Sequence, residues 1–174
     1  SVLIETSRLA RDQAKEEGAV EVAVKDAADA YRHQNALLDQ RSALLIKARE
    51  ELESQKRDLE DWVDVVGTIP ETLQAADDIR FKGSEIQRAQ KEIDADRSRI
   101  LITQLETQQR AIELNGDDEQ GKQRINDALI SENANLAAIL ARSIELASTD
   151  GLRRDLIKER IAVLDREEAL ARGN

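Results

Sequence analysis

Apolar residues recur at every seventh position along the first third of the chain. The repeat has no exception, and its members are Val24, Tyr31, Leu38, Leu45, Leu52, Leu59 and Val66. A seven-residue apolar repeat keeps one seam of a helix facing a partner helix and favours left-handed supercoiling. The pattern therefore predicts a helix from about residue 19 to 66, which at 1.5 Å per residue would be about 70 Å long.

The positions three residues after each member of this repeat are only partly apolar. They are Ala27, Gln34, Arg41, Ala48, Gln55 and Trp62. The predicted seam is therefore imperfect, and Arg41 and the later Asp96 fall at nominal seam positions. We expect these two either to extend their polar ends into solvent at the seam edge or to act as polar residues that allow only one pairing.

A second seven-residue repeat follows a short break in the pattern. Gly67 suits the position just after a helix, and Thr68 followed by Glu71 forms a capping-box pattern with the only proline, Pro70, in the first turn. The second repeat consists of Ile79, Ile86, Ile93 and Ile100. It predicts another long helix over residues 69–114.

The two repeats mirror each other about Ile69. Leu59 and Ile79 each lie 10 residues from it, and the same symmetry holds for the pairs Leu52–Ile86, Leu45–Ile93 and Leu38–Ile100. An antiparallel hairpin that turns near 67–70 would bring these apolar residues into level layers without any shift. The alternative is a straight helix that pairs in parallel with a second chain.

Shorter segments flank this predicted hairpin, which covers residues 19–114. Residues 1–18 form a weakly amphipathic N-terminal helix that we expect to end near Gly18. The alternation at 19–24 hints at a strand, although a continued helix suits its helical surroundings better. Residues 115–174 begin with a polar loop and continue as a helix pair. The predicted fold is all-α: a long antiparallel coiled-coil helical hairpin followed by a shorter helix pair.

Composition agrees with long helices that have narrow apolar seams. Charged residues make up 36% of the chain and aromatic residues only 2%, whereas a compact core of this size normally uses several aromatic side chains. The net charge is -10, and acidic and basic residues are interspersed without a basic face, so we expect no binding to nucleic acid. No stretch approaches the ~18 apolar residues of a membrane span, so we also expect no membrane-spanning helix.

The residue types that usually carry chemistry are few. His33 is the only histidine and there is no cysteine, so the common zinc and thiolate sites lack ligands. The acidic loop at 117–119 does not fit a calcium-binding loop, because Gln120 stands where such a loop needs glycine. We therefore expect no enzymatic activity, no cofactor and no metal.

The one tryptophan, Trp62, lies close to the predicted tip of the hairpin. Val63, Val66 and Ile69 are its neighbours there. Such a group either caps the end of the coiled coil or forms an exposed anchor for a partner, since aromatic residues are frequent hot spots at interfaces. We take these four residues as candidate interaction residues.

No diagnostic motif identifies a family. The hairpin over residues 30–110 resembles, in texture only, the helical extramembrane regions of large bacterial mechanosensitive channels. We expect a structural coiled-coil scaffold, spacer or assembly subunit that works through protein–protein contacts, as a homo-oligomer or in a larger assembly. The alternatives are a chaperone-like or regulatory helical adaptor and an extramembrane helical segment of a membrane machine. A complete chain would be cytoplasmic or part of a larger assembly.

Overall fold

The computed structural model describes the backbone of residues 2–116 and 118–173. Side chains are described at positions 15, 18, 19, 21–23, 25–116 and 118–173. These residues form four helices in sequence: α1 (Val2–Val66), α2 (Pro70–Asn115), α3 (Glu119–Leu146) and α4 (Asp150–Arg172).

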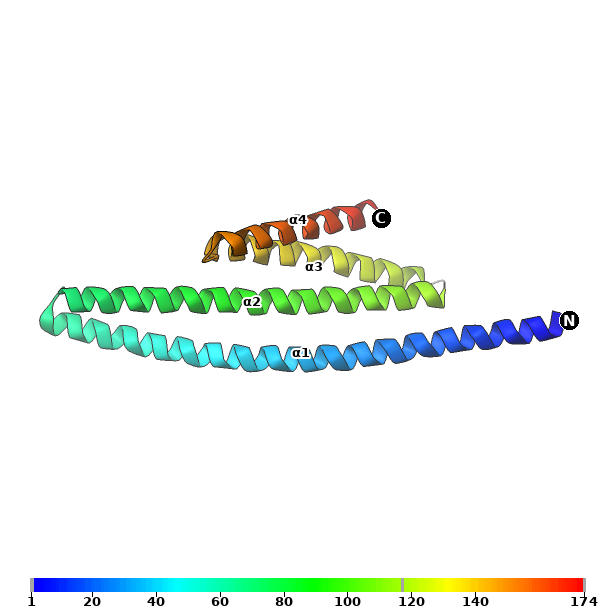
Figure 1. Ribbon diagram of the computed structural model, residues 1–174, viewed down its shortest axis with the longest axis horizontal. Coiled ribbons are helices and arrows are strands. Elements are labelled where there is room, and N and C mark those ends of the chain that lie inside the picture. The colour runs from blue at the N-terminus through cyan, green and yellow to red at the C-terminus, as the bar shows by residue number, and fades with distance from the viewer. Residues whose placement is uncertain (1, 117, 174) are drawn as a thin grey trace.

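Each helix packs its backbone closely only against its neighbours in the chain: α1 against α2, α2 against α3, and α3 against α4. Figure 1 shows the result, in which α1 and α2 form a long hairpin and α3 and α4 lie on the opposite side of α2 from α1. The predicted all-α hairpin followed by a helix pair is thus confirmed. Whether these segments act as separate domains stays a prediction.

Helix α1 is continuous over 65 residues. The break expected near Gly18 does not occur, and residues 19–24 are helical rather than extended. One glycine inside a helix costs only about 1 kcal/mol relative to alanine, so the helix on both sides can absorb it. Gly67, in contrast, has a φ of 76°, which residues with a side chain rarely adopt, and α1 ends just before it.

The turn between α1 and α2 is closed by backbone and side-chain hydrogen bonds. The amide of Gly67 donates to the carbonyl of Val63 at 2.7 Å. The predicted capping box between Thr68 and Glu71 is wrong, because α2 begins one residue later than that pattern requires, with Ile69 at the N-cap. The buried hydroxyl of Thr72 instead accepts from the Ile69 amide at 2.9 Å.

The interface between α1 and α2 uses both seven-residue repeats. Val66 at the turn is exposed, whereas nine of their members are buried or half-buried: Tyr31, Leu38, Leu45, Leu52, Leu59, Ile79, Ile86, Ile93 and Ile100. At the far end of the hairpin the hydroxyls of Tyr31 and Thr107 lie 3.2 Å apart. These two residues are equally distant from Ile69, so their contact agrees with the mirror register. The hairpin is therefore antiparallel and formed within one chain.

The second row of the α1 interface differs from the expected one. Gln34 and Arg41 are exposed, whereas Asn35 and Ser42, four residues after Tyr31 and Leu38, are half-buried. Small and polar residues in this row make the hairpin seam narrow. Arg41 lies at the seam edge, where its guanidinium pairs with Asp96 at 3.3 Å.

The main core lies between α2, α3 and α4 instead of within the hairpin. Its buried residues are Ala95, Ile102, Leu129, Leu136, Ala137, Leu140 and Val163. Helix α2 thus contributes to two interfaces, one with α1 and one with α3. The hairpin register places the end of α2 level with about residue 23 of α1, and the N-terminal part of α1 extends beyond the other helices (Figure 1).

Candidate functional site: the hairpin tip

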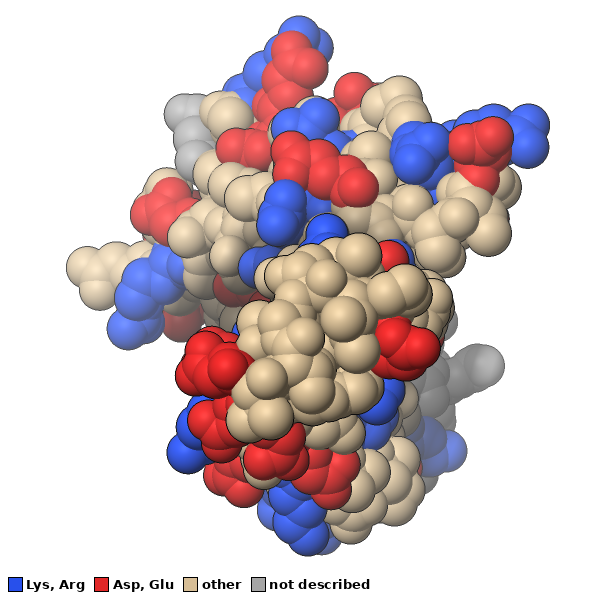
Figure 2. Space-filling view, turned by 90° about the vertical axis from the view of Figure 1, so that its left-hand side faces the viewer, with Lys and Arg blue, Asp and Glu red and all other residues tan. Residues whose placement is uncertain are grey.

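Exposed apolar side chains gather at the end of the hairpin, which we call the tip and define as residues 58–78. Trp62, Val65, Val66 and Leu73 are 41%, 83%, 42% and 51% exposed. Val63 and Ile69 of the same segment are half-buried. Figure 2 looks onto this end of the molecule and shows an uncharged surface with Asp and Glu beside and below it and some Lys and Arg around it. The four predicted interaction residues thus lie together, two exposed and two half-buried.

The tip carries an excess of negative charge. Its charged residues are seven carboxylates, with no Lys or Arg among residues 58–78: Asp58, Glu60, Asp61, Asp64, Glu71, Asp77 and Asp78. Asp77 pairs with Arg80 at 3.0 Å, and Asp78 accepts from Gln74 at 3.0 Å. The other five form no ion pair or hydrogen bond with any described side chain. The charge at the tip is therefore free to act on an approaching partner.

A groove runs beside Trp62 between the two arms of the hairpin. Its apolar lining comes from Leu59, Trp62, Ala75 and Ile79, and its polar lining consists of Gln55, Asp58, Asp78 and Lys82. Trp62 therefore has one part against the neighbouring helix and another part exposed to solvent. The capping and anchoring interpretations do not exclude each other at this position.

Two exposed apolar residues at the tip, Val65 and Leu73, were not predicted as interaction residues. Both lie outside the seven-residue repeats, so the seam pattern gave no reason to single them out. The signal that could have found them is the charge. The stretch from Asp58 to Asp78 has no basic residue, although the chain as a whole contains 26.

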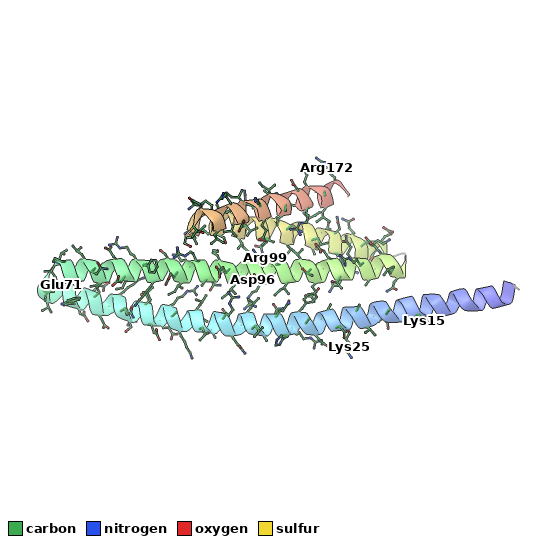
Figure 3. All side chains as sticks on the ribbon, in the orientation of Figure 1. Lys15, Lys25, Glu71, Asp96, Arg99 and Arg172 are labelled. Atoms are coloured by element: carbon green, nitrogen blue, oxygen red, sulfur yellow. The ribbon has the colours of Figure 1, made fainter. Side chains whose placement is uncertain are left out.

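Away from the tip, a cluster of four charged residues joins three helices near the middle of the molecule: Arg41, Asp96, Arg99 and Glu159. Arg99 of α2 donates from Nε and Nη2 to the two carboxylate oxygens of Glu159 in α4, at 2.8 and 2.6 Å. It also donates to Asp96 at 2.7 Å, and Asp96 in turn pairs with Arg41 of α1. Figure 3 labels Asp96 and Arg99 near the middle of α2. Because α4 otherwise packs against α3, this cluster is a direct side-chain link from α4 to the hairpin.

Electrostatics in this cluster hold Arg99 in its charged form. The hydrogen bond to Glu159 has the largest influence and raises the pKa of the Arg99 guanidinium. Burial lowers this pKa, but the charges of Glu159 and Asp96 raise it further, so the net shift is upward. The cluster of Arg41, Asp96, Arg99 and Glu159 contains no hydroxyl, thiol or imidazole group. It links α1, α2 and α4 through their side chains.

The remaining polar residues that the sequence singled out do not form a site in the described part of the chain. Asp118 caps α3, because its carboxylate accepts from the amide of Gly121 at 2.9 Å, and Asp117 lies outside the described residues. His33 is exposed on α1. Among the side chains that the structure describes, no three His, Cys, Asp or Glu residues are grouped so that they could hold a metal ion.

The described helices include none with the length and apolar character needed to cross a membrane. In comparisons with known proteins, no family model, no curated protein and no solved structure matches the chain. Any functional assignment must therefore come from the surfaces of the molecule. The tip combines exposed apolar area with unpaired charge and is the best candidate.

Proposed function

We propose that the chain is a structural coiled-coil scaffold or spacer, an assembly subunit that works through protein–protein contacts made at the hairpin tip. The observation that carries the proposal is the exposed apolar cluster Trp62, Val65, Val66 and Leu73, which lies among seven carboxylates, five of them without an ion pair or hydrogen bond to a described side chain. Contiguous apolar patches with a polar rim mark interaction sites on protein surfaces. Aromatic residues at their centre tend to supply most of the binding energy.

The position of the tip supports a spacer role. Arg88 donates to the carbonyl of Leu146 at the place where α3 ends, so α2 before residue 88 has only α1 beside it. The eighteen residues from Pro70 to residue 87 correspond to about 27 Å of helix. A two-helix arm of about this length therefore holds the tip away from the main core (Figure 1).

The chemistry of the tip defines the kind of partner that fits it. A surface with an apolar ridge or groove bordered by Lys and Arg would bury the exposed apolar residues and neutralise the carboxylates. Such complementarity accelerates association and excludes acidic competitors. The arms of the hairpin pack against each other from the turn to Tyr31, which gives no support to a clamp that grips a client between them.

Trp62 is the only tryptophan in the chain, so its fluorescence reports directly on the tip. The probe is a helical peptide of about 20 residues with Leu on one face and Lys on the other. We expect it to shift the Trp62 emission and to bind with a Kd that rises at least tenfold in a Val65→Ser/Leu73→Ser variant. Leu44→Ser is the control, since Leu44 is an apolar residue of α1 outside the tip and its exposure of 65% lies between those of Leu73 and Val65.

Two further variants separate the apolar and the charged contributions. Asp61→Lys/Asp64→Lys should weaken binding of the Lys peptide and improve binding of the same peptide with Glu in place of Lys. Trp62→Ala should cost about 1–2 kcal/mol of stability, below the ~3–5 kcal/mol of a fully buried aromatic residue, because Trp62 is 41% exposed. Unchanged peptide affinity in all tip variants would rule out the tip as the contact site.

A further inference from the structure

Helix α4 has a second apolar face that no other described helix covers. On its inner face Val163 is buried and Leu156 and Leu170 pack against the core. Away from this inner face, about 100–160° around the helix from Val163, Ile157, Ile161 and Leu164 are 39%, 55% and 37% exposed. Their spacing of four and three residues places them on one stripe of the helix. Because α4 packs closely only against α3, this outer stripe faces solvent.

Charged residues continue the outer stripe at both of its ends. Asp150 and Arg154 precede the apolar residues, and Glu168 and Arg172 follow them. With 3.6 residues per turn, all four lie within about 60° of the mid-line of the stripe. All four are exposed. Arg153 lies within the same angle and pairs with Asp150 at 3.0 Å, and Glu168 pairs with Arg172 in the same helix. From one end to the other the stripe therefore reads negative, two positive residues, three apolar residues, negative and positive.

This order of charges complements itself when the helix is reversed. Asp150 and Arg172 each lie 11 residues from Ile161, and Arg154 and Glu168 each lie 7 residues from it. If a second α4 runs antiparallel with Ile161 at the centre, each acidic residue is level with a basic one. Ile161 then meets the same residue of the other copy, and Ile157 lies next to Leu164 of that copy.

We propose that α4 pairs with α4 of a second copy of this chain, antiparallel and related by a two-fold axis at Ile161. The inference rests on the assembly role proposed above and names its partner. Apolar contact at the centre would supply most of the affinity, since exposed ion pairs add little. The charges would fix orientation, because a parallel pair in register would place Arg154 beside Arg154 and Glu168 beside Glu168.

The proposed dimer has a consequence for the hairpin tips. The hairpin runs along the same general direction as α4 (Figure 1). A two-fold axis perpendicular to α4 therefore directs the two tips towards opposite ends of the dimer. Such a particle would present two equal contact sites and could bridge two partners, which is the usual advantage of bivalency. Figure 3 marks Glu71 at the tip and Arg172 at the end of the outer stripe.

Sedimentation velocity of the full chain over a range of concentrations tests the pairing. We expect a species of twice the chain mass of 19.5 kDa, about 39 kDa. Ile161→Glu should raise the dimer Kd at least tenfold and leave the circular dichroism spectrum unchanged, because Ile161 is 55% exposed. Ile46→Glu is the matched control, since Ile46 is 51% exposed on α1 and lies outside both surfaces.

Charge reversal tests the antiparallel arrangement. Arg154→Glu alone and Glu168→Arg alone should each raise the Kd about tenfold, because each places like charges level with each other. The double variant should regain the original Kd, since the swapped residues can still pair. Asp155→Arg, a reversal on the flank of α4, should have no such effect. Oxidation of an Ile161→Cys variant should give a covalent dimer, because the chain has no other cysteine.

Three results would overturn the pairing. A monomer at every concentration would mean that something other than a second copy covers the outer stripe. A dimer that survives Ile161→Glu but is lost in Val65→Ser/Leu73→Ser would place the interface at the tip. A dimer that both single reversals leave unchanged would be parallel or lie elsewhere. The peptide assay at the tip does not depend on dimerisation, so the two proposals fail separately.

Discussion

Replacing Arg99 with methionine removes the ion pair that ties α4 to α2 and keeps much of the apolar length of the side chain. The pair is bidentate, and the side chains of Arg99 and Glu159 are 37% and 31% exposed. Removing one partner of a fully buried pair costs roughly 3–5 kcal/mol, whereas an exposed pair contributes about 0.2–1 kcal/mol. Since about a third of each side chain is in contact with solvent, screening reduces the buried figure, and we expect a loss of about 1–2 kcal/mol.

Urea unfolding followed by circular dichroism, on Arg99→Met, Glu159→Gln and the double variant, gives the coupling energy between the two residues. We expect a coupling of about 1 kcal/mol. In the Arg99→Met variant, hydrogen exchange of the α4 amides should accelerate more than that of the α2 amides, because the ion pair no longer holds α4 against α2. The control is Arg142→Met, which breaks an exposed pair with Glu145 within α3 and should cost less than about 0.5 kcal/mol.

The pKa of Arg99 fixes the sign of any alkaline effect. Because its pKa is raised above the ordinary arginine value, the stabilisation is complete below that ordinary value and is lost only as the pH rises through the still higher folded value. The coupling energy measured at about pH 7 and about pH 10 should therefore be equal. A coupling below about 0.3 kcal/mol at pH 7, or unchanged exchange of α4, would refute the role assigned to this pair.

Three further changes test the hairpin and the core. Thr72→Val should lower the free energy of unfolding by about 1–2 kcal/mol in thermal melts, because the Ile69 amide loses its acceptor, and Thr72→Ser should retain most of it. Leu45→Cys/Ile93→Cys should oxidise to a crosslinked monomer on a denaturing gel, and a covalent dimer alone would contradict the register. Asn133→Leu should raise the melting temperature, with a gain of about 1 kcal/mol, since the buried Asn133 Oδ1 has no hydrogen-bond partner among the described residues.

The hairpin could be predicted from the sequence because its information is local and periodic. Two repeats of seven, a break at Gly67 and their symmetry about Ile69 contain both the direction and the register of the pair. No long-range contact had to be assumed. The helix pair was also predictable as two amphipathic segments, because wide apolar faces require a neighbouring helix.

Other features depend on how far each helix is rotated about its axis, which the repeat alone does not determine. The α1 interface uses Asn35 and Ser42 in place of Gln34 and Arg41, a shift of one position. Arg99 and Glu159 are 60 residues apart and meet because α3 sets the distance between α2 and α4. The cap by Thr72 follows from a helix start one residue later than the capping-box pattern indicates.

The two candidate surfaces could not be predicted from the periodic pattern, and the reason is physical. A repeat identifies residues that must be buried within the fold, and it is silent about apolar residues that remain outside. Val65 and Leu73 at the tip and Ile161 on α4 belong to this second group. They become visible only after the internal interfaces have been assigned and the remaining apolar residues are compared with the charges around them.

The uneven burial along the hairpin links its stability to its proposed contacts. Near the core, α2 is packed between α1 and α3, but from Pro70 to residue 87 the two arms have only the narrow seam between them. At the tip several like charges also lie close together, and their repulsion opposes the close approach of the arms. A basic apolar partner would remove this repulsion and bury Trp62, so its binding would add to the stability of the arm by mass action. When no partner is bound, the arm is therefore least stable at the tip, which is the region where we propose that the partner binds.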